Sequence, residues 1–327
     1  MEHDAAHAKI VADNCLSRSG RGYAPAHITG FFTIHLTGDP MSSGSKGAGI
    51  CLKDGISCSV SVEDSPRPSL SILMNNSPIS SIPTCRSLVR IMLPDAPPFS
   101  IRAAQSSVLP PNYGYGISGS SALSTAIAIS GAMELDLPAT KIGQYAHAAE
   151  IENLTGLGDV SAELAGGFEV RLAPGAPGVG QLQPLPFPRG HYVITAPVMS
   201  FPTSRMITEP KYVERINSLG QSALEAFLES PTIGNFMHQS RIFWEGVGIA
   251  DDRIMSVMRL FERAGIASPS AKKGLVFGIV SEDELHSVVK KLSPSSPRLE
   301  GEPPFVIEEG TERIKIIISE IAQGGAC

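Results

Sequence analysis

Apolar and polar residues alternate along several stretches in the first third of the chain, and this period of two predicts β-strands. The clearest stretch is 50–62, which contains Asp54-Gly55 as a candidate hairpin turn. Further strand candidates are 28–34, 70–74, 88–93 and 101–108. We therefore expect several antiparallel strands before residue 110.

Helical patterns dominate the chain beyond that point. The run 122–133 is built of small and apolar residues on all sides, which predicts a buried helix. The run 139–154 has helical spacing, and His147 and Glu150 share one of its faces. Further helices are expected at 208–229, 232–248, 251–264 and 281–292, and strands at 168–172, 191–197, 275–280 and 313–318. This order favours an α+β fold over alternating β-α-β units.

Prolines and glycines are concentrated between residues 173 and 190, which makes this segment the best candidate for a domain boundary. Since 327 residues are enough for two domains, we expect an N-terminal extension over 1–20, an N-terminal domain over 21–188 and a C-terminal domain over 189–327.

Composition narrows the class of protein. A formal net charge of −6 argues against a nucleic-acid partner, and no apolar run reaches the length of a membrane-spanning helix. The five cysteines are odd in number and form no C-x-x-C pair. We expect a cytoplasmic protein with reduced thiols, without a disulfide framework or a zinc site.

Glycine and serine are unusually dense at 112–124, immediately before the buried helix. Such a segment lets backbone N–H groups approach a ligand closely, and the helix N-terminus favours an anion such as phosphate. A tight turn with a serine N-cap is the alternative. Spacing of Gly114, Gly116 and Gly119 matches the dinucleotide fingerprint, but no continuous apolar strand precedes it, and no Walker-type P-loop occurs in the chain.

Candidates exist for each part that phosphoryl transfer from ATP requires. Ser120 can offer a hydroxyl to Mg²⁺, Glu150 a carboxylate to the same ion, and Asp159 a carboxylate to the acceptor hydroxyl. His147 and Arg171 can bind a carboxylate on the acceptor. Each has a plainer interpretation: Asp159 as a helix N-cap, Glu150 as a solvated residue, and Arg171 as a structural partner of Glu169.

Two N-terminal segments stay open on the same grounds. His27 can contact a ligand, or it can be a hydrogen-bonded structural residue. The Gly/Ser segment 39–49 can be a hairpin loop or a lid over a substrate.

Three segments resemble the motifs of the GHMP small-molecule kinases: 24–30 (Ala-Pro-Ala-His-Ile-Thr-Gly), 116–124 (Gly-Ile-Ser-Gly-Ser-Ser-Ala-Leu-Ser) and 155–159 (Thr-Gly-Leu-Gly-Asp). The similarity extends over roughly 21–280, and the C-terminal glycine motif departs from the pattern at 267–274. Within this superfamily the chain most resembles the archaeal-type pantoate kinases, through 28–32, 39–49, the Gly-Tyr-Gly-Ile-Ser-Gly variant and the Thr-Gly-Leu-Gly-Asp-Val turn.

The resemblance implies a fold, an activity and a set of roles. The fold would combine an N-terminal half like domain 2 of ribosomal protein S5 with a C-terminal ferredoxin-like α/β sandwich. The activity would be ATP-dependent phosphorylation of the primary hydroxyl of pantoate to 4-phosphopantoate, for coenzyme A synthesis, in a possible homodimer. Alternatives are a mevalonate or homoserine kinase and a non-catalytic sensor on the same fold.

The resemblance also implies roles for individual residues. Asp159 would be the catalytic base, with Ser120 and Glu150 on Mg²⁺-ATP. The nucleotide phosphates would contact Gly114, Gly116, Ser118, Gly119, Ser120 and Ser121, and pantoate would contact His147, Arg171, Ser45, Thr203 and His27. Ser43 and Ser204 are alternatives to Ser45 and Thr203.

Overall fold

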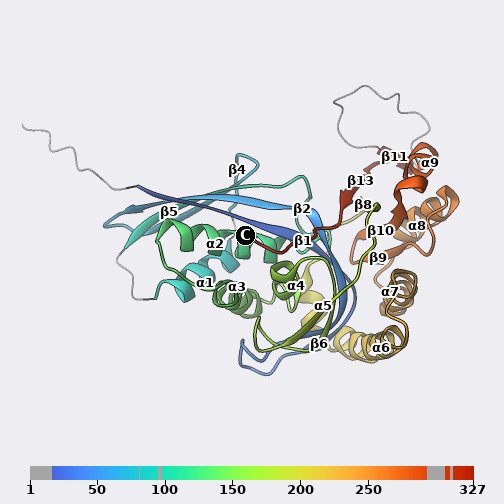
Figure 1. The fold of residues 1–327 in the computed structure, drawn as a ribbon, viewed down its shortest axis with the longest axis horizontal. Coiled ribbons are helices and arrows are strands. Elements are labelled where there is room, and N and C mark those ends of the chain that lie inside the picture. Colours follow the sequence, from blue (N-terminus) through green and yellow to red (C-terminus); the bar gives the residue numbers. More distant parts are fainter. Residues whose placement is uncertain (1–16, 81, 95–97, 293–305, 310–311) are drawn as a thin grey trace, which may run out of the picture.

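The computed structural model describes residues 17–80, 82–94, 98–292, 306–309 and 312–327. In this part of the chain a seven-stranded sheet and a four-stranded sheet are each covered by helices (Figure 1). The strands of the larger sheet are β1 (Arg18–His35), β2 (Gly44–Asp64), β3 (Ser69–Met74), β4 (Ser77–Pro78), β5 (Phe99–Ser106), β6 (Phe168–Ala173) and β7 (Gln181–Leu185).

The larger sheet is built around β2, which pairs with β1, β5 and β6. These pairs are antiparallel, as the sequence predicts, whereas β3 and β5 run parallel. A parallel neighbour needs a crossover connection. Helix α1 (Pro83–Met92) supplies that crossover between β3 and β5.

The strand expected at 88–93 is wrong, because this segment is the second half of α1. Pro83 stands at the start of the helix, where its missing N–H carries no penalty. Cys85, Leu88 and Met92 are buried at helical spacing, so the apolar positions follow a period near 3.6 rather than two.

The hairpin turn expected at Asp54-Gly55 is also wrong, because both residues lie inside β2. The register between β1 and β2 shifts here, from Ala24 opposite Ile56 to Ala26 opposite Leu52. A side chain at Gly55 would place Cβ 2.0 Å from the carbonyl oxygen of Ala24. The glycine therefore serves a close approach between two strands at an irregularity, not a turn.

Helix α2 (Ile117–Ala132) lies against β1 and β2 and is buried on nearly all sides, which confirms the prediction for 122–133. Gly20 and Gly22 allow this contact, since a Cβ at either would lie within 2.3 Å of a backbone oxygen of α2. Helices α3 (Ala139–Asn153) and α4 (Asp159–Ala165) complete the layer with α1 (Figure 1).

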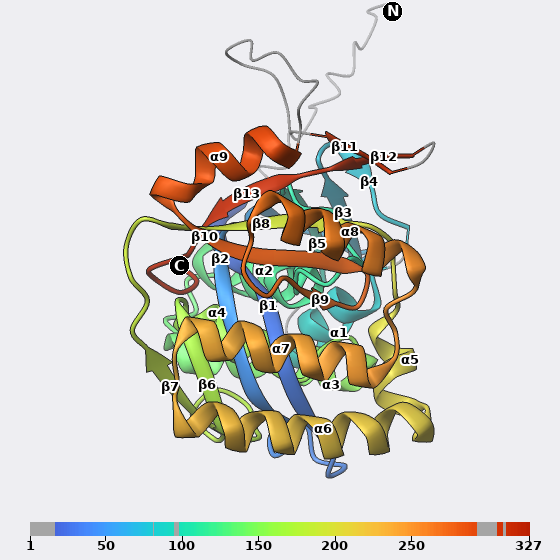
Figure 2. The same ribbon diagram turned by 90° about the vertical axis from the view of Figure 1, so that its right-hand side faces the viewer.

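The C-terminal part contains the smaller antiparallel sheet, in the order β13-β8-β10-β9. Two long helices, α6 and α7, cross the outer face of β1, with α8 and α9 beside the smaller sheet (Figure 2). The elements are β8 (His191–Pro197), α5 (Thr203–Thr208), α6 (Pro210–Glu229), α7 (Ile233–Val247), α8 (Asp252–Ala264), β9 (Ser270–Lys272), β10 (Leu275–Ser281), α9 (Glu282–Leu292), β11 (Val306–Glu309), β12 (Glu312–Lys315) and β13 (Ile317–Glu320).

One apolar core runs through both parts. Phe31 of β1 and Phe168 of β6 pack against Phe227 and Phe236 of α6 and α7, with ring centroids 5.2 to 6.2 Å apart. The last residues return to the larger sheet, where Cys327 exchanges backbone hydrogen bonds with Tyr23. Within the described residues, no helix has both the length and the apolar character needed to cross a membrane.

The contact between α6 and β1 gives a test of the packing. Ala is a better helix former than Gly by about 1 kcal/mol, yet a Cβ at Gly220 would lie 2.0 Å from the Phe32 carbonyl oxygen. Because overpacking costs about 1–3 kcal/mol, we expect Gly220→Ala to lower the free energy of unfolding by a net ~1–2 kcal/mol in urea titrations.

Gly234 in α7 is the matched control, since a Cβ there meets nothing within 4 Å. Gly234→Ala should leave stability unchanged or raise it slightly. A Gly220→Ala variant as stable as the wild-type protein would contradict this description of the interface.

Candidate active site

The glycine-rich segment forms a loop that ends directly in α2. Gly114 and Gly116 have φ angles of +109° and +71°, which the side chains of other residues rarely tolerate. Helix α2 begins at Ile117, so the backbone N–H groups of its first turn have no helical partner and point out of the helix start. This confirms a loop-to-helix junction suited to an anion.

The loop is fixed to the C-terminal part of the chain. The Tyr115 hydroxyl donates to Thr195 Oγ1 of β8, and the Tyr115 carbonyl accepts from the N–H of His27. A Cβ at Gly114 would lie 2.6 Å from the carbonyl oxygen of Lys272. The loop therefore lies where β1 and the smaller sheet meet.

Ser120 does not occupy the position expected of a metal ligand. Its side chain is fully buried, and its hydroxyl donates to the Pro25 carbonyl and to Glu163 Oε1. Ser118, one helical turn position earlier, instead donates to Glu150 Oε1 at 2.5 Å. The hydroxyl beside the candidate metal ligand is thus that of Ser118.

Glu163 is a buried carboxyl that the sequence analysis did not single out. Burial, reinforced by Asp159, raises its pKa well above the usual range. A Cβ at Gly119 would lie 2.8 Å from Glu163 Oε2, so the absence of a side chain there lets the carboxyl fit beneath the loop. Glu163 and Ser120 therefore support the start of α2 from inside.

Glu150 is buried on α3, not solvated as its plainer interpretation required. Burial raises its pKa to about 7, while hydrogen bonds from Ser118 and Thr155 partly oppose the shift. Both hydroxyls donate to Oε1, and Oε2 has no partner. A buried carboxylate with one oxygen free is a suitable ligand for a hard cation.

A magnesium ion fits this donor set. The described residues contain no cluster of three or more His, Cys, Asp or Glu that could hold a metal by itself. Mg²⁺ usually takes only one or two protein oxygens and completes its shell with phosphate and water. A Cβ at Gly156 would lie 2.1 Å from Glu150 Oε2, so this glycine keeps the space beside the oxygen open.

Asp159 is the first residue of α4, and its carboxylate does not cap the helix. Oδ1 lies 2.7 Å from His27 Nδ1 and 3.4 Å from Lys272 Nζ. Burial opposes ionisation, but Lys272 and His27 outweigh it and hold the pKa of Asp159 well below its usual range. The side chain is therefore an ionised carboxylate that accepts hydrogen bonds.

His27 was expected as a possible substrate contact, and the structure places it elsewhere. Its ring is fully buried, with Nδ1 on Asp159 and Nε2 3.1 Å from Glu169 Oε1. Gly49 makes room for it, since a Cβ there would lie 2.1 Å from Nε2. His27 supports Asp159 from below, as the structural interpretation of this residue held.

Two lysines that sequence analysis passed over complete the site. Lys272 Nζ lies 3.0 Å from the His27 carbonyl oxygen and 3.4 Å from Asp159 Oδ1. Lys273 follows with a left-handed φ of +57°, and its Nζ donates to Thr203 Oγ1. The sequence showed them only as a basic pair inside a degenerate motif.

A pocket opens in front of Asp159. Its polar wall includes Thr29, Ser45, Asp159, Thr203 and the two lysines, and its apolar wall consists of Phe32, Leu157, Met206, Ile207 and Trp244. These residues come from β1, β2, the 156–158 turn, α4, α5, α7 and the 272–273 turn. Such a pocket suits a small molecule that is part apolar and part anionic.

The other predicted acceptor contacts surround the hairpin between β1 and β2. His147 Nε2 lies 3.0 Å from the Ser43 carbonyl oxygen, and burial lowers the pKa of this imidazole. Arg171 is almost fully buried, pairs with Glu169, and donates from Nε to Ser45 Oγ at 3.3 Å. The structural pairing of Arg171 with Glu169 is therefore present.

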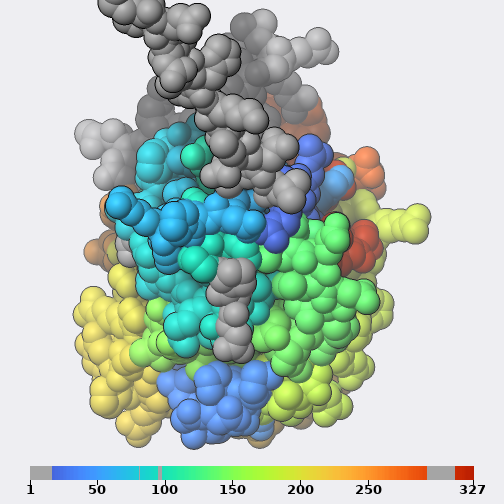
Figure 3. Space-filling view, turned by 90° about the vertical axis from the view of Figure 1, so that its left-hand side faces the viewer, coloured from blue at the N-terminus to red at the C-terminus, as the bar shows by residue number. Residues whose placement is uncertain are grey.

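A second pocket adjoins the first across the 156–158 turn. Ser45 and Gly158 line both pockets, while Arg171 lines only this one. Segment 39–43 is the hairpin loop and 44–49 belongs to β2. Figure 3 shows the hairpin as the blue surface at the lower edge of the molecule, and backbone hydrogen bonds join it to Ala176.

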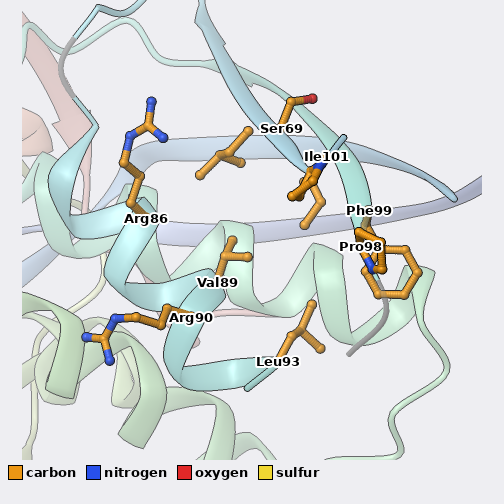
Figure 4. A pocket seen from close by; sticks show the side chains of 10 residues that line it. Ser69, Arg86, Val89, Arg90, Leu93, Pro98, Phe99 and Ile101 are labelled. Carbon is orange, nitrogen blue, oxygen red and sulfur yellow. The ribbon is translucent and has the colours of Figure 1, made fainter. Parts of the chain in front are cut away.

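A separate pocket of about 470 Å³ lies between α1, β3 and β5 (Figure 4). Arg86, Val89 and Arg90 reach it from the helix, opposite Phe99 and Ile101. It contains none of the candidate site residues. Since α1 approaches the site at Thr84, which contacts Thr155, this pocket lies at the far end of the helix.

Comparison with known proteins agrees with this geometry. The family model described as "GHMP kinases N terminal domain" matches residues 84–167, which include the glycine loop, Glu150 and Asp159. The pantoate kinase of Thermococcus kodakarensis is 30% identical over 303 residues, covering 90% of this chain and 97% of the relative. The chain belongs to the GHMP kinase superfamily.

Two further matches support this assignment. The pantoate kinase of Methanocaldococcus jannaschii is 28% identical, over 83% of this chain and 96% of its own length. A solved structure described as "Phosphotransferase related to CoA biosynthesis pathway" aligns with a TM-score of 0.80 and 26% identity, over 94% of this chain and 98% of that one. The mixed α+β fold is therefore that of the GHMP kinases, which are ATP-dependent small-molecule kinases.

The buried Glu150 gives a pH-dependent test. A pKa raised from 4.5 to about 7 means that ionisation is easier in the unfolded chain, so folding loses stability as pH rises through this range. Glu150→Gln should therefore raise the free energy of unfolding at pH 8 by up to ~3 kcal/mol, and the gain should shrink towards pH 5.

Glu152 is the control, because it is exposed on the same helix and pairs with Arg90 at the surface. Glu152→Gln should change stability by less than about 1 kcal/mol at either pH. Equal stability of Glu150→Gln and the wild-type protein at pH 8, in denaturant titrations, would count against a charged carboxylate held in the interior.

Proposed function

We propose that this GHMP kinase transfers the γ-phosphoryl group of ATP to the primary hydroxyl of (R)-pantoate, giving 4-phosphopantoate for coenzyme A biosynthesis. The observation that carries the proposal is the pocket in front of Asp159, where an ionised carboxylate faces a cavity with one apolar and one cationic wall. The curated relatives, which are pantoate kinases, point to the same acceptor.

The chemistry of pantoate matches the two walls. The molecule has a carboxylate, two hydroxyls and a carbon that bears two methyl groups. The methyl groups would pack against Phe32, Met206 and Trp244, which line the apolar wall. Its carboxylate would lie near Arg171 and Ser45, where the two pockets adjoin, because Arg171 retains donors beyond those used by Glu169 and Ser45.

The proposed reaction uses the site as follows. The phosphates of ATP would lie against the first turn of α2, with Mg²⁺ held by Glu150 and Ser118 and neutralising the phosphate charge. Asp159 would orient the acceptor hydroxyl and take its proton. The acceptor oxygen then forms a bond to the γ-phosphorus as the bond to the β–γ bridging oxygen breaks, and ADP leaves.

Homoserine and mevalonate are the alternative acceptors within the same class. Homoserine carries an ammonium group, and the pocket presents Lys272 and Lys273 with Asp159 as its lining carboxylate, so a second cation is poorly accommodated. Mevalonate is an anion with one methyl group and fits better. A non-catalytic sensor has no need of an ionised carboxylate oriented from both sides, as Asp159 is.

The direct experiment measures ADP release with pantoate, mevalonate and homoserine in parallel. We expect the highest kcat/KM with pantoate, and phosphorylation at the primary hydroxyl by ³¹P NMR. Trp244 is the only tryptophan of the chain and lines the pocket, so its fluorescence reports acceptor binding independently of turnover. A preference for mevalonate or homoserine would refute the assigned acceptor.

Replacement of the base gives a separate prediction. Asp159→Asn keeps the shape of the side chain but removes its ability to take a proton, so kcat should fall by about 10²–10⁴-fold with ATP affinity nearly unchanged. Asp283→Asn, at an exposed position of α9, is the control and should retain full activity. A loss of less than tenfold in Asp159→Asn would exclude the base role.

A further inference from the structure

Phosphoryl transfer needs positive charge beside the moving group. In many phosphoryl-transfer enzymes part of that charge comes from a lysine or arginine that contacts the transferred phosphoryl. Here the glycine-rich loop from Asn112 to Ser121 contains neither residue type. Among the described residues that line the pocket, the side-chain cations are Lys272 and Lys273.

Lys272 is already committed to other groups. Its side chain is buried, and Nζ lies 3.0 Å from the His27 carbonyl oxygen and 3.4 Å from Asp159 Oδ1. Its charge is therefore largely used to hold the base in its ionised form. An incoming phosphate would have to compete with Asp159 for it.

Lys273 is in a different situation. Its Nζ donates to the hydroxyl of Thr203, and within the described part of the chain no carboxylate lies at ion-pair distance from it. The side chain is half-buried and lines the pocket beside Asp159. An ammonium group with a neutral partner in a pocket for anions has donors left for a phosphate oxygen.

The backbone fixes Lys273 in this place. Its φ of +57° lies in the left-handed region, which residues with a side chain adopt rarely and mostly where the surrounding structure enforces it. The next residue, Gly274, packs so closely that a Cβ would lie 1.7 Å from the Met199 carbonyl oxygen. The turn between β9 and β10 therefore presents two successive lysines to the site from fixed positions.

We propose that Lys273 is a catalytic residue that contacts the transferred phosphoryl group, while Lys272 holds Asp159. The two lysines thus divide the work that one basic residue could not perform, because one charge cannot serve both the base and the phosphate. The inference rests on phosphoryl transfer at this site, and does not depend on pantoate being the acceptor.

The charge environment of Lys273 agrees with this role. Burial and the neighbouring Lys272 lower its pKa to about 8, against the opposing effect of Asp159 and Glu150. An ammonium group in this position gains more from a bound phosphate than one already neutralised by a carboxylate. It also means that the charge is lost as pH rises through about 8.

The test compares Lys273→Met, which keeps the length of the side chain without its charge, with Lys273→Arg, which keeps the charge. Binding is measured by calorimetry for Mg²⁺-ADP alone and for Mg²⁺-ADP with aluminium fluoride, which mimics the transferred phosphoryl. Lys273→Met should bind ADP almost as wild type but bind the fluoride complex at least about 100-fold more weakly, with a similar fall in kcat. Lys273→Arg should recover most of that affinity.

Lys290→Met is the matched control, because Lys290 is exposed on α9 and contacts nothing in the site. It should match the wild-type protein in both measurements. If Lys273→Met keeps wild-type affinity for the fluoride complex, or loses affinity for ADP and the complex equally, the proposal is overturned. Retained ADP binding by Lys273→Met also shows that the variant is folded.

A pH profile gives a second readout. The wild-type kcat should decline as pH rises through about 8, since neutral Lys273 no longer stabilises the phosphoryl group. The decline should move to higher pH in Lys273→Arg, whose guanidinium stays charged. If pantoate is not turned over but the fluoride complex still discriminates between the variants, the acceptor assignment fails while the role of Lys273 stands.

Discussion

The site depends on one carboxylate held between two cationic or hydrogen-bonding partners. Asp159 lies against His27 from β1 and Lys272 from β9, and these three residues are far apart in the sequence. Without both partners, burial would drive the carboxyl towards its neutral form, which cannot accept a proton. The close contact between the two parts of the chain therefore sets the chemical state of the base.

This arrangement places an unusual amount of charge inside the protein. Glu150, Glu163 and Glu169 are buried within the same region, and each has one side-chain oxygen without a partner. Such groups destabilise the fold, because desolvation of a carboxylate is offset only in part by the available hydrogen bonds. The large aromatic core around Phe168, Phe227 and Phe236 provides apolar burial that offsets this loss.

Several glycines have a single purpose in this context: they let backbone or polar groups approach where a Cβ would collide. Gly49 accommodates the His27 ring, Gly119 the Glu163 carboxyl and Gly156 the Glu150 carboxyl. Sequence alone suggests turns or phosphate contacts for glycines of this kind. The structure shows that several of them instead fit around buried ionisable groups.

Local patterns were sufficient for most elements. The helices 117–132 and 139–153 and the strands 168–173 and 275–281 follow from spacing that the core enforces on every turn or pleat. Predictions failed where short apolar runs were ambiguous, at 88–93, and where a glycine pair imitated a turn inside a long strand, at 54–55. In both places the deciding contact comes from a residue distant in sequence.

The sequence by itself determined the superfamily, the α+β class and the three segments that carry Gly116, Glu150 and Asp159. Only the tertiary structure decided which hydroxyl meets Glu150, that His27 faces inward, and that Lys272 and Lys273 enter the site. The reason is physical: a motif fixes the local backbone, whereas the partner of a polar side chain depends on which segment folds against it. No pattern within the 267–274 segment reveals that it will lie against Gly114 and Asp159.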